Sequence, residues 1–223
     1  LIGAQALVNG GYSFEDGQIR VEMHLYDPLI GGHLLSRNYV AKGKEMSVVA
    51  HHFAEEILQE LTGERGVFTT KIAFVSAASK RKEISIMDMG GSNVHPLTKE
   101  KQIALSPTWS PSGEMIAYTS IRKDGSAEVM VIPSSGGNAT GGSPQKVTDN
   151  GTVNVSTSWS KSGLLTIASA ISGDTEIYLM SLKGKVLQKL TDSFGIDINP
   201  SWSPDGSAFV FASERAGRLH LFR

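Results

Sequence analysis

From about residue 67 onward, the apolar positions fall into short runs that recur in a fixed order. Each copy begins at a Trp-Ser-x-x-Gly segment and continues into an apolar run that ends in Ser. A polar loop then leads to a second run, in which apolar and polar residues alternate, and a Gly-bearing turn leads to a last segment that ends in Thr. Runs of this length between turn residues predict β-strands, four to a copy.

The three tryptophans of the chain, Trp109, Trp159 and Trp202, occupy the same position in successive copies. They are 50 and 43 residues apart, and a period of about 40–50 residues with four strands is typical of a β-propeller blade. The longer interval contains the Gly- and Ser-rich segment Ser134–Pro144, which we expect to be a loop extension. Because tryptophan recurs at the same place in each copy, we expect it to pack between neighbouring blades. The less favoured alternative is that the three tryptophans stack against a ligand.

Two further copies are partial. Ile72–Ser76 matches Ile116–Ser120 at a distance of 44 residues but has no Trp strand before it, and the last copy stops at Arg223. About three and a half blades are therefore expected. Because a propeller hides its strand edges by closing on itself, we expect these residues to be part of a longer protein.

The first 66 residues follow a different pattern. Ala4–Gly11 predicts a strand and a turn, Gln18–Asp27 alternates strictly as a half-buried strand does, and His33–Val40 predicts a return strand. Apolar residues at three- and four-residue intervals then predict an amphipathic helix over Lys44–Thr62, which Gly63 ends. The expected fold is an α+β N-terminal domain, incomplete at its start, over residues 1–66, followed by an all-β propeller over residues 67–223.

Composition excludes several classes of function. A net charge of −1 with 19% charged residues argues against nonspecific binding to nucleic acid. The chain has no cysteine, so it has neither disulfides nor thiolate chemistry. No run of 18 apolar residues occurs, so we expect no membrane span.

Candidate chemistry is sparse. The six histidines are scattered, and His51 and His52 are adjacent instead of four residues apart as a helical metal site requires. Neither a Gly-x-Ser-x-Gly elbow nor a His-Glu-x-x-His motif is present. Asp205 stands in a Pro-Asp-Gly turn, where the other copies carry Ser112 and Ser162. We therefore expect no catalytic, cofactor-binding or metal-binding residues.

The junction Leu61–Ser76, the helical segment Ala50–Ile57 and the Trp-Ser-Pro-Asp-Gly repeats, in that order, resemble the TolB family over essentially the whole chain. The resemblance implies an N-terminal α/β domain and a six-bladed propeller, export to the periplasm through a cleavable signal peptide, and a monomer. It also implies a scaffold that binds the peptidoglycan-associated lipoprotein Pal, links it to inner-membrane Tol proteins, and supports outer-membrane integrity and constriction at division. The family's TolA-binding segment has no counterpart here, so no residue is assigned to TolA.

In that family Pal docks on the propeller face formed by the loops that enter the inner strands. If the Trp strand is innermost, the matching segments here lie just before each Trp. Their apolar residues suggest a docking surface, although they could instead plug the central channel. The candidate partner-binding residues are Ile103, Ala104, Leu105, Val153, Asn154, Val155, Ser156, Ile196, Asp197, Ile198 and Asn199.

Two alternatives remain open at this point. The repeats would also fit the propeller of a periplasmic prolyl-oligopeptidase-like peptidase, which a nucleophile elbow beyond Arg223 would reveal. A carbohydrate-binding propeller would need exposed aromatics on one face, but the chain has only 16 aromatic residues and most lie at strand positions. Whether a calcium ion occupies the channel is also open.

Overall fold

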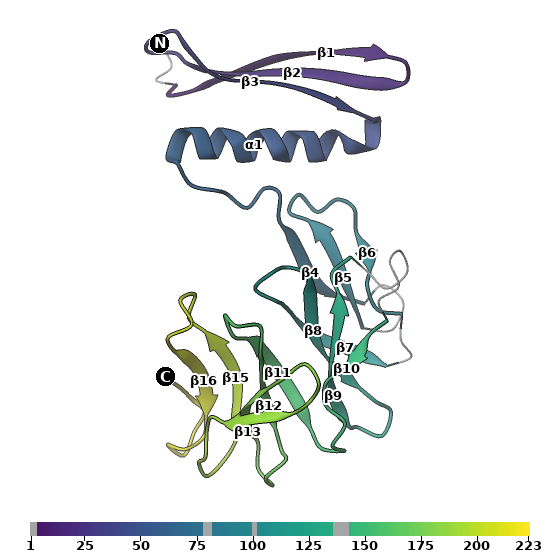
Figure 1. Ribbon diagram of the computed structural model, residues 1–223, viewed down its shortest axis with the longest axis vertical. Helices are drawn as coiled ribbons and strands as arrows, with labels where there is room; N and C mark the ends of the chain where they lie inside the picture. Colours follow the sequence, from purple (N-terminus) through teal and green to yellow (C-terminus); the bar gives the residue numbers. More distant parts are fainter. Residues whose placement is uncertain (1–3, 78–81, 100–101, 136–142) are drawn as a thin grey trace. The chain divides into compact units, whose positions relative to one another are not determined.

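The computed structural model describes residues 4–77, 82–99, 102–135 and 143–223. The chain divides into two compact units (Figure 1). The first comprises residues 1–72 with 87–94, and the second comprises residues 73–86 with 95–223. The expected domain boundary at residues 66 and 67 stays a prediction. Part of the expected loop extension, residues 136–142, lies outside the described residues.

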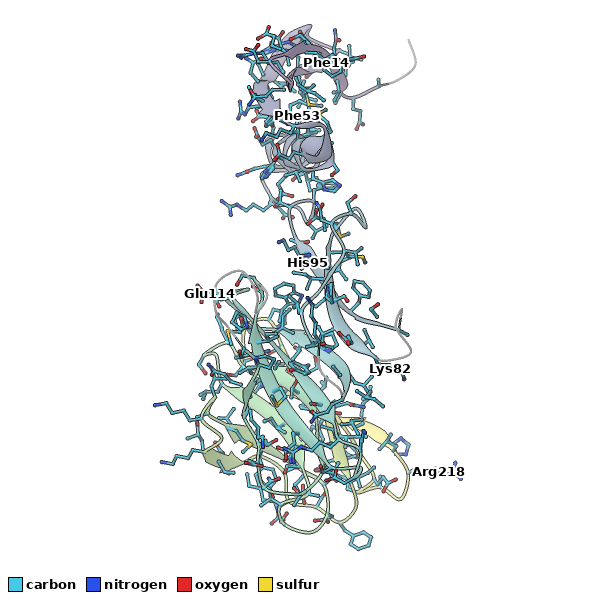
Figure 2. All side chains as sticks on the ribbon, turned by 90° about the vertical axis from the view of Figure 1, so that its right-hand side faces the viewer. Phe14, Phe53, Lys82, His95, Glu114 and Arg218 are labelled. Carbon is cyan, nitrogen blue, oxygen red and sulfur yellow. The ribbon has the colours of Figure 1, made fainter. Side chains whose placement is uncertain are left out.

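The first unit is a three-stranded antiparallel sheet with one helix on one face (Figure 1). The strands are β1 (Leu7–Glu15), β2 (Gln18–Asp27) and β3 (Gly32–Ala41), and a 3-10 turn, η1 (Gly43–Glu45), leads into α1 (Met46–Thr62). Leu25, Leu35 and Phe53 form its buried core, and Figure 2 shows Phe53 between sheet and helix. The expected helix and its end are confirmed: Gly63 has φ 75°, and its N–H donates to the Gln59 carbonyl at 2.9 Å.

The expected end of the first strand was wrong. β1 does not turn at Gly10-Gly11 but continues to Glu15, which pairs with Gln18 across a two-residue hairpin loop. That loop is Asp16-Gly17, and both residues have positive φ, 50° and 73°, as a type I′ turn requires. Gly10 instead allows close strand contact, because a Cβ there would lie 2.3 Å from the Glu22 carbonyl oxygen. The Asp-Gly pair was therefore the turn signal, and the Gly-Gly pair belongs to the strand interior.

The second unit consists of four antiparallel sheets that follow one another in an arc (Figure 1). Each sheet is one copy of the repeat, with its strands in sequence order, and the first and last have three strands. This confirms the blade-like strand order and the missing Trp strand of the first copy. The sheets are β4 (Lys71–Ser76), β5 (Glu83–Asp88) and β6 (His95–Pro96); β7 (Ile103–Trp109), β8 (Met115–Ile121), β9 (Ala127–Pro133) and β10 (Gln145–Lys146); β11 (Asn154–Trp159), β12 (Leu165–Ser169), β13 (Glu176–Met180) and β14 (Val186–Lys189); β15 (Asp197–Trp202), β16 (Phe209–Ser213) and β17 (His220–Phe222).

The tryptophans join neighbouring blades, as expected. Trp159 is buried in one core cluster with Val129 and Val131 of the preceding blade, and its indole N–H donates to the Thr108 carbonyl at 3.1 Å. The indole N–H of Trp202 donates to Thr166 Oγ1 of the preceding blade at 2.7 Å. An indole N–H that is shielded from water needs a partner, and the preceding blade supplies it for the buried Trp159 and the half-buried Trp202.

The threonine that ends each copy also has a repeated role. Thr98, Thr148 and Thr191 each accept a hydrogen bond from the backbone N–H of the second or third residue of the alternating strand, at 2.8–3.0 Å. In the third blade the Thr191 hydroxyl also donates to Glu176 Oε2 at 2.6 Å, and both residues are buried. One hydroxyl thus satisfies a donor and a buried carboxylate, which explains why the last segment of a copy ends in Thr.

We expect Thr191→Val to lower the free energy of unfolding of the propeller unit by about 1–3 kcal/mol, because it leaves a buried N–H and a buried carboxylate with one partner fewer. Thr157→Val is the matched control, since the buried Thr157 hydroxyl oxygen has no hydrogen-bond partner among the described residues. We expect that control to stay within about 0.5 kcal/mol of the parent. Urea unfolding followed by tryptophan fluorescence measures both, because all three tryptophans lie in this unit. Equal effects of the two substitutions would contradict the proposed role.

Gly184 marks a close approach of two blades. It lies in the turn between β13 and β14 with φ 78°, and a Cβ there would lie 2.2 Å from the Val147 carbonyl oxygen. Gly125 also has positive φ, 85°, but no heavy atom lies near the position of its Cβ. In both alanine variants, a residue with a Cβ must adopt the left-handed backbone conformation, which is strained. Only in Gly184→Ala does the new Cβ also clash with the Val147 carbonyl oxygen. We expect Gly184→Ala to be about 1–3 kcal/mol more destabilising than Gly125→Ala in urea unfolding.

Candidate partner-binding face of the propeller

Each Trp strand carries a β-bulge three residues before its tryptophan. The pairing register shifts between Leu105 and Thr108 in the second blade, and the third and fourth blades repeat the shift. The bulged residues Ser106, Ser156 and Asn199 have positive φ, 52°, 53° and 55°, which is unusual for residues other than glycine. Bulges bend a strand and re-aim its side chains, often beside functional sites.

The segments expected to be loops are instead largely the first residues of these inner strands. β7 begins at Ile103, β11 at Asn154 and β15 at Asp197. Because Ile103 pairs with Ile121 at the end of β8, the strand start and the loop after the Ser-ending run lie at the same end of the blade. Figure 2 shows Glu114, which follows a Trp-Ser-x-x-Gly turn, and Arg218, in the loop after β16, at opposite ends of the blades.

Burial alternates along each of these segments. The side chains six residues before Trp are exposed: Ile103 at 43%, Val153 at 46% and Ile196 at 36%. The next residue in each segment is buried: Ala104, Asn154 and Asp197. Leu105, Val155 and Ile198 are half-buried. Only the first of these three rows offers apolar surface freely to a partner.

The buried polar residues have internal partners. Asn154 accepts from the Ser169 hydroxyl at 2.7 Å and donates to the Ala127 carbonyl of the preceding blade at 3.2 Å. Asp197 pairs with Arg215 Nη2 at 2.8 Å, and its carboxylate is fully buried. These contacts give Asn154 and Asp197 a structural role within the blades.

The left-handed residues of neighbouring inner strands contact each other. Ser156 Oγ donates to Asn199 Oδ1 at 2.7 Å, which joins the third and fourth blades at the bulge. Asn199 remains exposed, and Ser156 is half-buried. The polar groups at the bulges therefore lie three residues after the exposed side chains Ile103, Val153 and Ile196, and together they form a surface of mixed character.

Sequence reasoning missed two apolar residues at the same end of the blades. Phe194 is 94% exposed and stands two residues before Ile196, and Ile171, in the loop after β12, is 42% exposed. The sequence does contain a sign of both, because each is a large apolar residue among turn residues. We call the set Ile103, Val153, Ile171, Phe194 and Ile196 the apolar row.

Asp205 is not a candidate acid. The Ser203 hydroxyl, the Ser207 N–H and the Ser207 hydroxyl all donate to its carboxylate, at 2.5–3.0 Å. These hydrogen bonds lower the pKa of Asp205 to about 2. The group is therefore ionised at neutral pH and organises its turn, as the Pro-Asp-Gly pattern predicts.

Tyr39, in the first unit, also has a shifted pKa. Burial, followed by the hydrogen bond to Glu56, raises the pKa of Tyr39 to about 12. Within the described ranges, no group of three or more His, Cys, Asp or Glu side chains is placed to hold a metal ion. Among the described residues, no helix has the combination of length and apolar character that a membrane span needs.

Comparison with known proteins matches residues 58–223 to the family described as "TolB beta propeller domain". A "Tol-Pal system protein TolB" from Desulfosudis oleivorans is 34% identical over 189 residues, which are 84% of this chain and 41% of that protein. A "Protein TolB homolog" from Chlorobium luteolum is 32% identical over 221 residues, 99% of this chain and 49% of that protein. The chain thus spans less than half the length of these relatives.

Among solved structures, the crystal structure of TolB from Acinetobacter baumannii resembles this chain with a TM-score of 0.83 and 28% identity. The match covers 99% of this chain and 55% of that one. Both compact units therefore have counterparts in that structure, and the expectation of a TolB-type fold is confirmed.

Proposed function

The chain belongs to the TolB family of β-propeller proteins, and from that premise we propose that it is a non-enzymatic scaffold of the Tol–Pal system. Its place of action is the periplasm, and its partner is the lipoprotein Pal. The whole protein links Pal to the inner-membrane Tol proteins and thereby supports outer-membrane integrity and constriction at division. No residue of this chain is assigned to the contact with TolA.

The observation that most directly supports Pal binding is the apolar row. Three of its members, Ile103, Val153 and Ile196, recur at the same place in three successive blades, and all five members are at least 36% exposed. Apolar side chains gathered at one end of a blade array are typical of a protein-binding surface. Among the predicted residues, this favours Ile103, Val153 and Ile196 as the direct contacts, with Ser156 and Asn199 as polar contacts beside them.

The same arrangement supports a binding role over a catalytic one. Near the apolar row, the buried acids Glu128, Glu176 and Asp197 are held by threonine, serine, lysine or arginine side chains of their own blades. The Ser36 hydroxyl of the first unit lies 3.0 Å from His24 Nδ1, but Ser36 stands within β3 and not at the strand-to-helix turn of a nucleophile elbow. We therefore propose that the propeller works by recognition.

Calorimetric titration of the protein with the soluble domain of Pal from the same organism tests the proposal. Saturable one-to-one binding is the expected result. Absence of binding by folded protein would remove Pal as the partner, and hydrolysis of peptide substrates would then test the peptidase alternative.

A further inference from the structure

Two histidines of the first unit meet on the sheet although they are nine residues apart in the sequence. His24 Nδ1 lies 3.2 Å from His33 Nε2, and the two ring centroids are 5.3 Å apart. The Ser36 hydroxyl oxygen lies 3.0 Å from the same His24 nitrogen. His24 Nδ1 thus has a second ring nitrogen and a hydroxyl oxygen within 3.2 Å.

The strand register explains this meeting. His24 pairs with Ser36, and Leu25 pairs with Leu35 in the buried core. His24 and Ser36 therefore point to the face away from the core, because side chains alternate along a strand. A register shift then pairs Tyr26 with His33 instead of Leu34. Without this bulge, His33 would occupy the opposite face from His24.

The spacing of the two nitrogens suits a shared metal ion. With Zn–N bonds of about 2.0–2.1 Å, two neighbouring ligands of a tetrahedral ion stand about 3.3 Å apart. The observed separation of His24 Nδ1 and His33 Nε2 is 3.2 Å before any ion enters. The two rings would therefore need little movement to bind one cation together.

A carboxylate positions one of the rings. Glu22 Oε1 lies 3.2 Å from His24 Nε2, the ring nitrogen that faces away from His33. This contact favours the proton on Nε2 and leaves the lone pair of Nδ1 directed at the gap. Metal-binding histidines usually donate their other N–H to a carboxylate in this way, which fixes the ring and raises its basicity.

We propose that His24 and His33 form a binding site for a late first-row divalent cation such as Zn²⁺, with Glu22 as a positioning residue. The Ser36 hydroxyl and water complete the coordination. Imidazole nitrogens suit Zn²⁺ and Cu²⁺. Because no third His, Cys, Asp or Glu of the described residues joins the group, water fills the remaining coordination positions, and the site binds the cation more weakly than a site with three or four protein ligands does. His33 is exposed and His24 half-buried, so a cation can reach the site.

Zn²⁺ titration of the tag-free protein against a chromophoric chelator tests this site at pH 7.5. The expected result is one equivalent of Zn²⁺, with a Kd raised at least tenfold by His24→Asn or His33→Asn. Glu22→Gln should raise the Kd about tenfold and keep the stoichiometry, because it disturbs only the orientation of His24. His52→Asn, an exposed histidine of α1, is the matched control and should change nothing.

Electron paramagnetic resonance of bound Cu²⁺ gives an independent readout of the ligands. Two nitrogen couplings are expected in the parent protein and one in His33→Asn. The proposal is overturned if Zn²⁺ shows no saturable binding, if the His24 and His33 variants bind as the parent does, or if only one nitrogen couples to Cu²⁺ in the parent. Circular dichroism confirms that each variant is folded before it is compared.

Discussion

Arg215→Met is expected to lower the free energy of unfolding of the propeller unit by about 3–5 kcal/mol, because it leaves a buried carboxylate without its counter-ion. The Asp197 side chain is fully buried, and its short contact to a cation is with Arg215 Nη2 at 2.8 Å. Among the described residues, its other donor is the Ser193 hydroxyl, at 3.3 Å from both carboxylate oxygens. A single neutral donor at that distance cannot replace a guanidinium.

Replacing the other partner, as in Asp197→Asn, should lower the free energy of unfolding by less. Asp197→Asn leaves Arg215 with a side chain 34% exposed, the Ser213 hydroxyl at 2.8 Å, and the rings of Phe211 and Phe222, each with its centroid 4.9 Å from the guanidinium carbon. The guanidinium can therefore turn toward water or stay over the rings. Methionine at position 215 keeps the apolar contact with those rings, so the loss measured in Arg215→Met belongs mainly to the charge.

A double-mutant cycle separates the pair from its surroundings. The double variant with Arg215→Met and Asp197→Asn should be more stable than Arg215→Met alone by at least about 1 kcal/mol, because the buried charge is gone. Urea unfolding followed by tryptophan fluorescence measures the parent and the three variants. If Arg215→Met costs less than Asp197→Asn, or if the double variant is the least stable of the three, the buried carboxylate is not what Arg215 stabilises.

Asp197 also shows where sequence reasoning stops. The repeat predicts the strand order because each copy contains its own turn residues, as at Pro204-Asp205-Gly206. It does not predict that the residue five before Trp is buried, because that depends on a cross-strand neighbour. Asn154 pairs with Ser169 and Asp197 with Ser213, on the strand that follows each Trp strand. From the sequence alone, a polar residue at the start of a strand is expected to be exposed, and the prediction that Asn154 and Asp197 offer their side chains to a partner fails for this reason.

The histidine pair was beyond sequence reasoning for a related reason. His24 and His33 share a face only because of the register shift after Leu25. Strict alternation predicts His24 correctly on the polar face of its strand. It gives no sign of a bulge in the return strand, because Leu34 and Leu35 are both apolar and either could face the core. The alternation of apolar and polar residues therefore predicts which side chains share a face within one strand. It does not predict which side chains share a face across an irregular pairing.

Val153→Asp is expected to weaken Pal binding by about 2–4 kcal/mol, which is roughly 30- to 1000-fold in Kd. Val153 is 46% exposed at the centre of the apolar row, and its backbone already pairs with Ala127 and Ala170. A docked partner would have to bury the new carboxylate without a matching cation, which costs far more than the lost apolar contact. Because the side chain points outward, the propeller itself should fold as before.

Val186→Asp is the matched control, since Val186 is 41% exposed on β14, the strand farthest from the inner strand of the same blade. It introduces the same charge into the same unit at nearly the same exposure, so any general effect of charge appears in both proteins. Calorimetry with the soluble domain of Pal should give a parent-like Kd for Val186→Asp and a much weaker one for Val153→Asp. If the two variants bind Pal equally well, the apolar row is not the docking surface, and its side chains instead line the inside of the propeller.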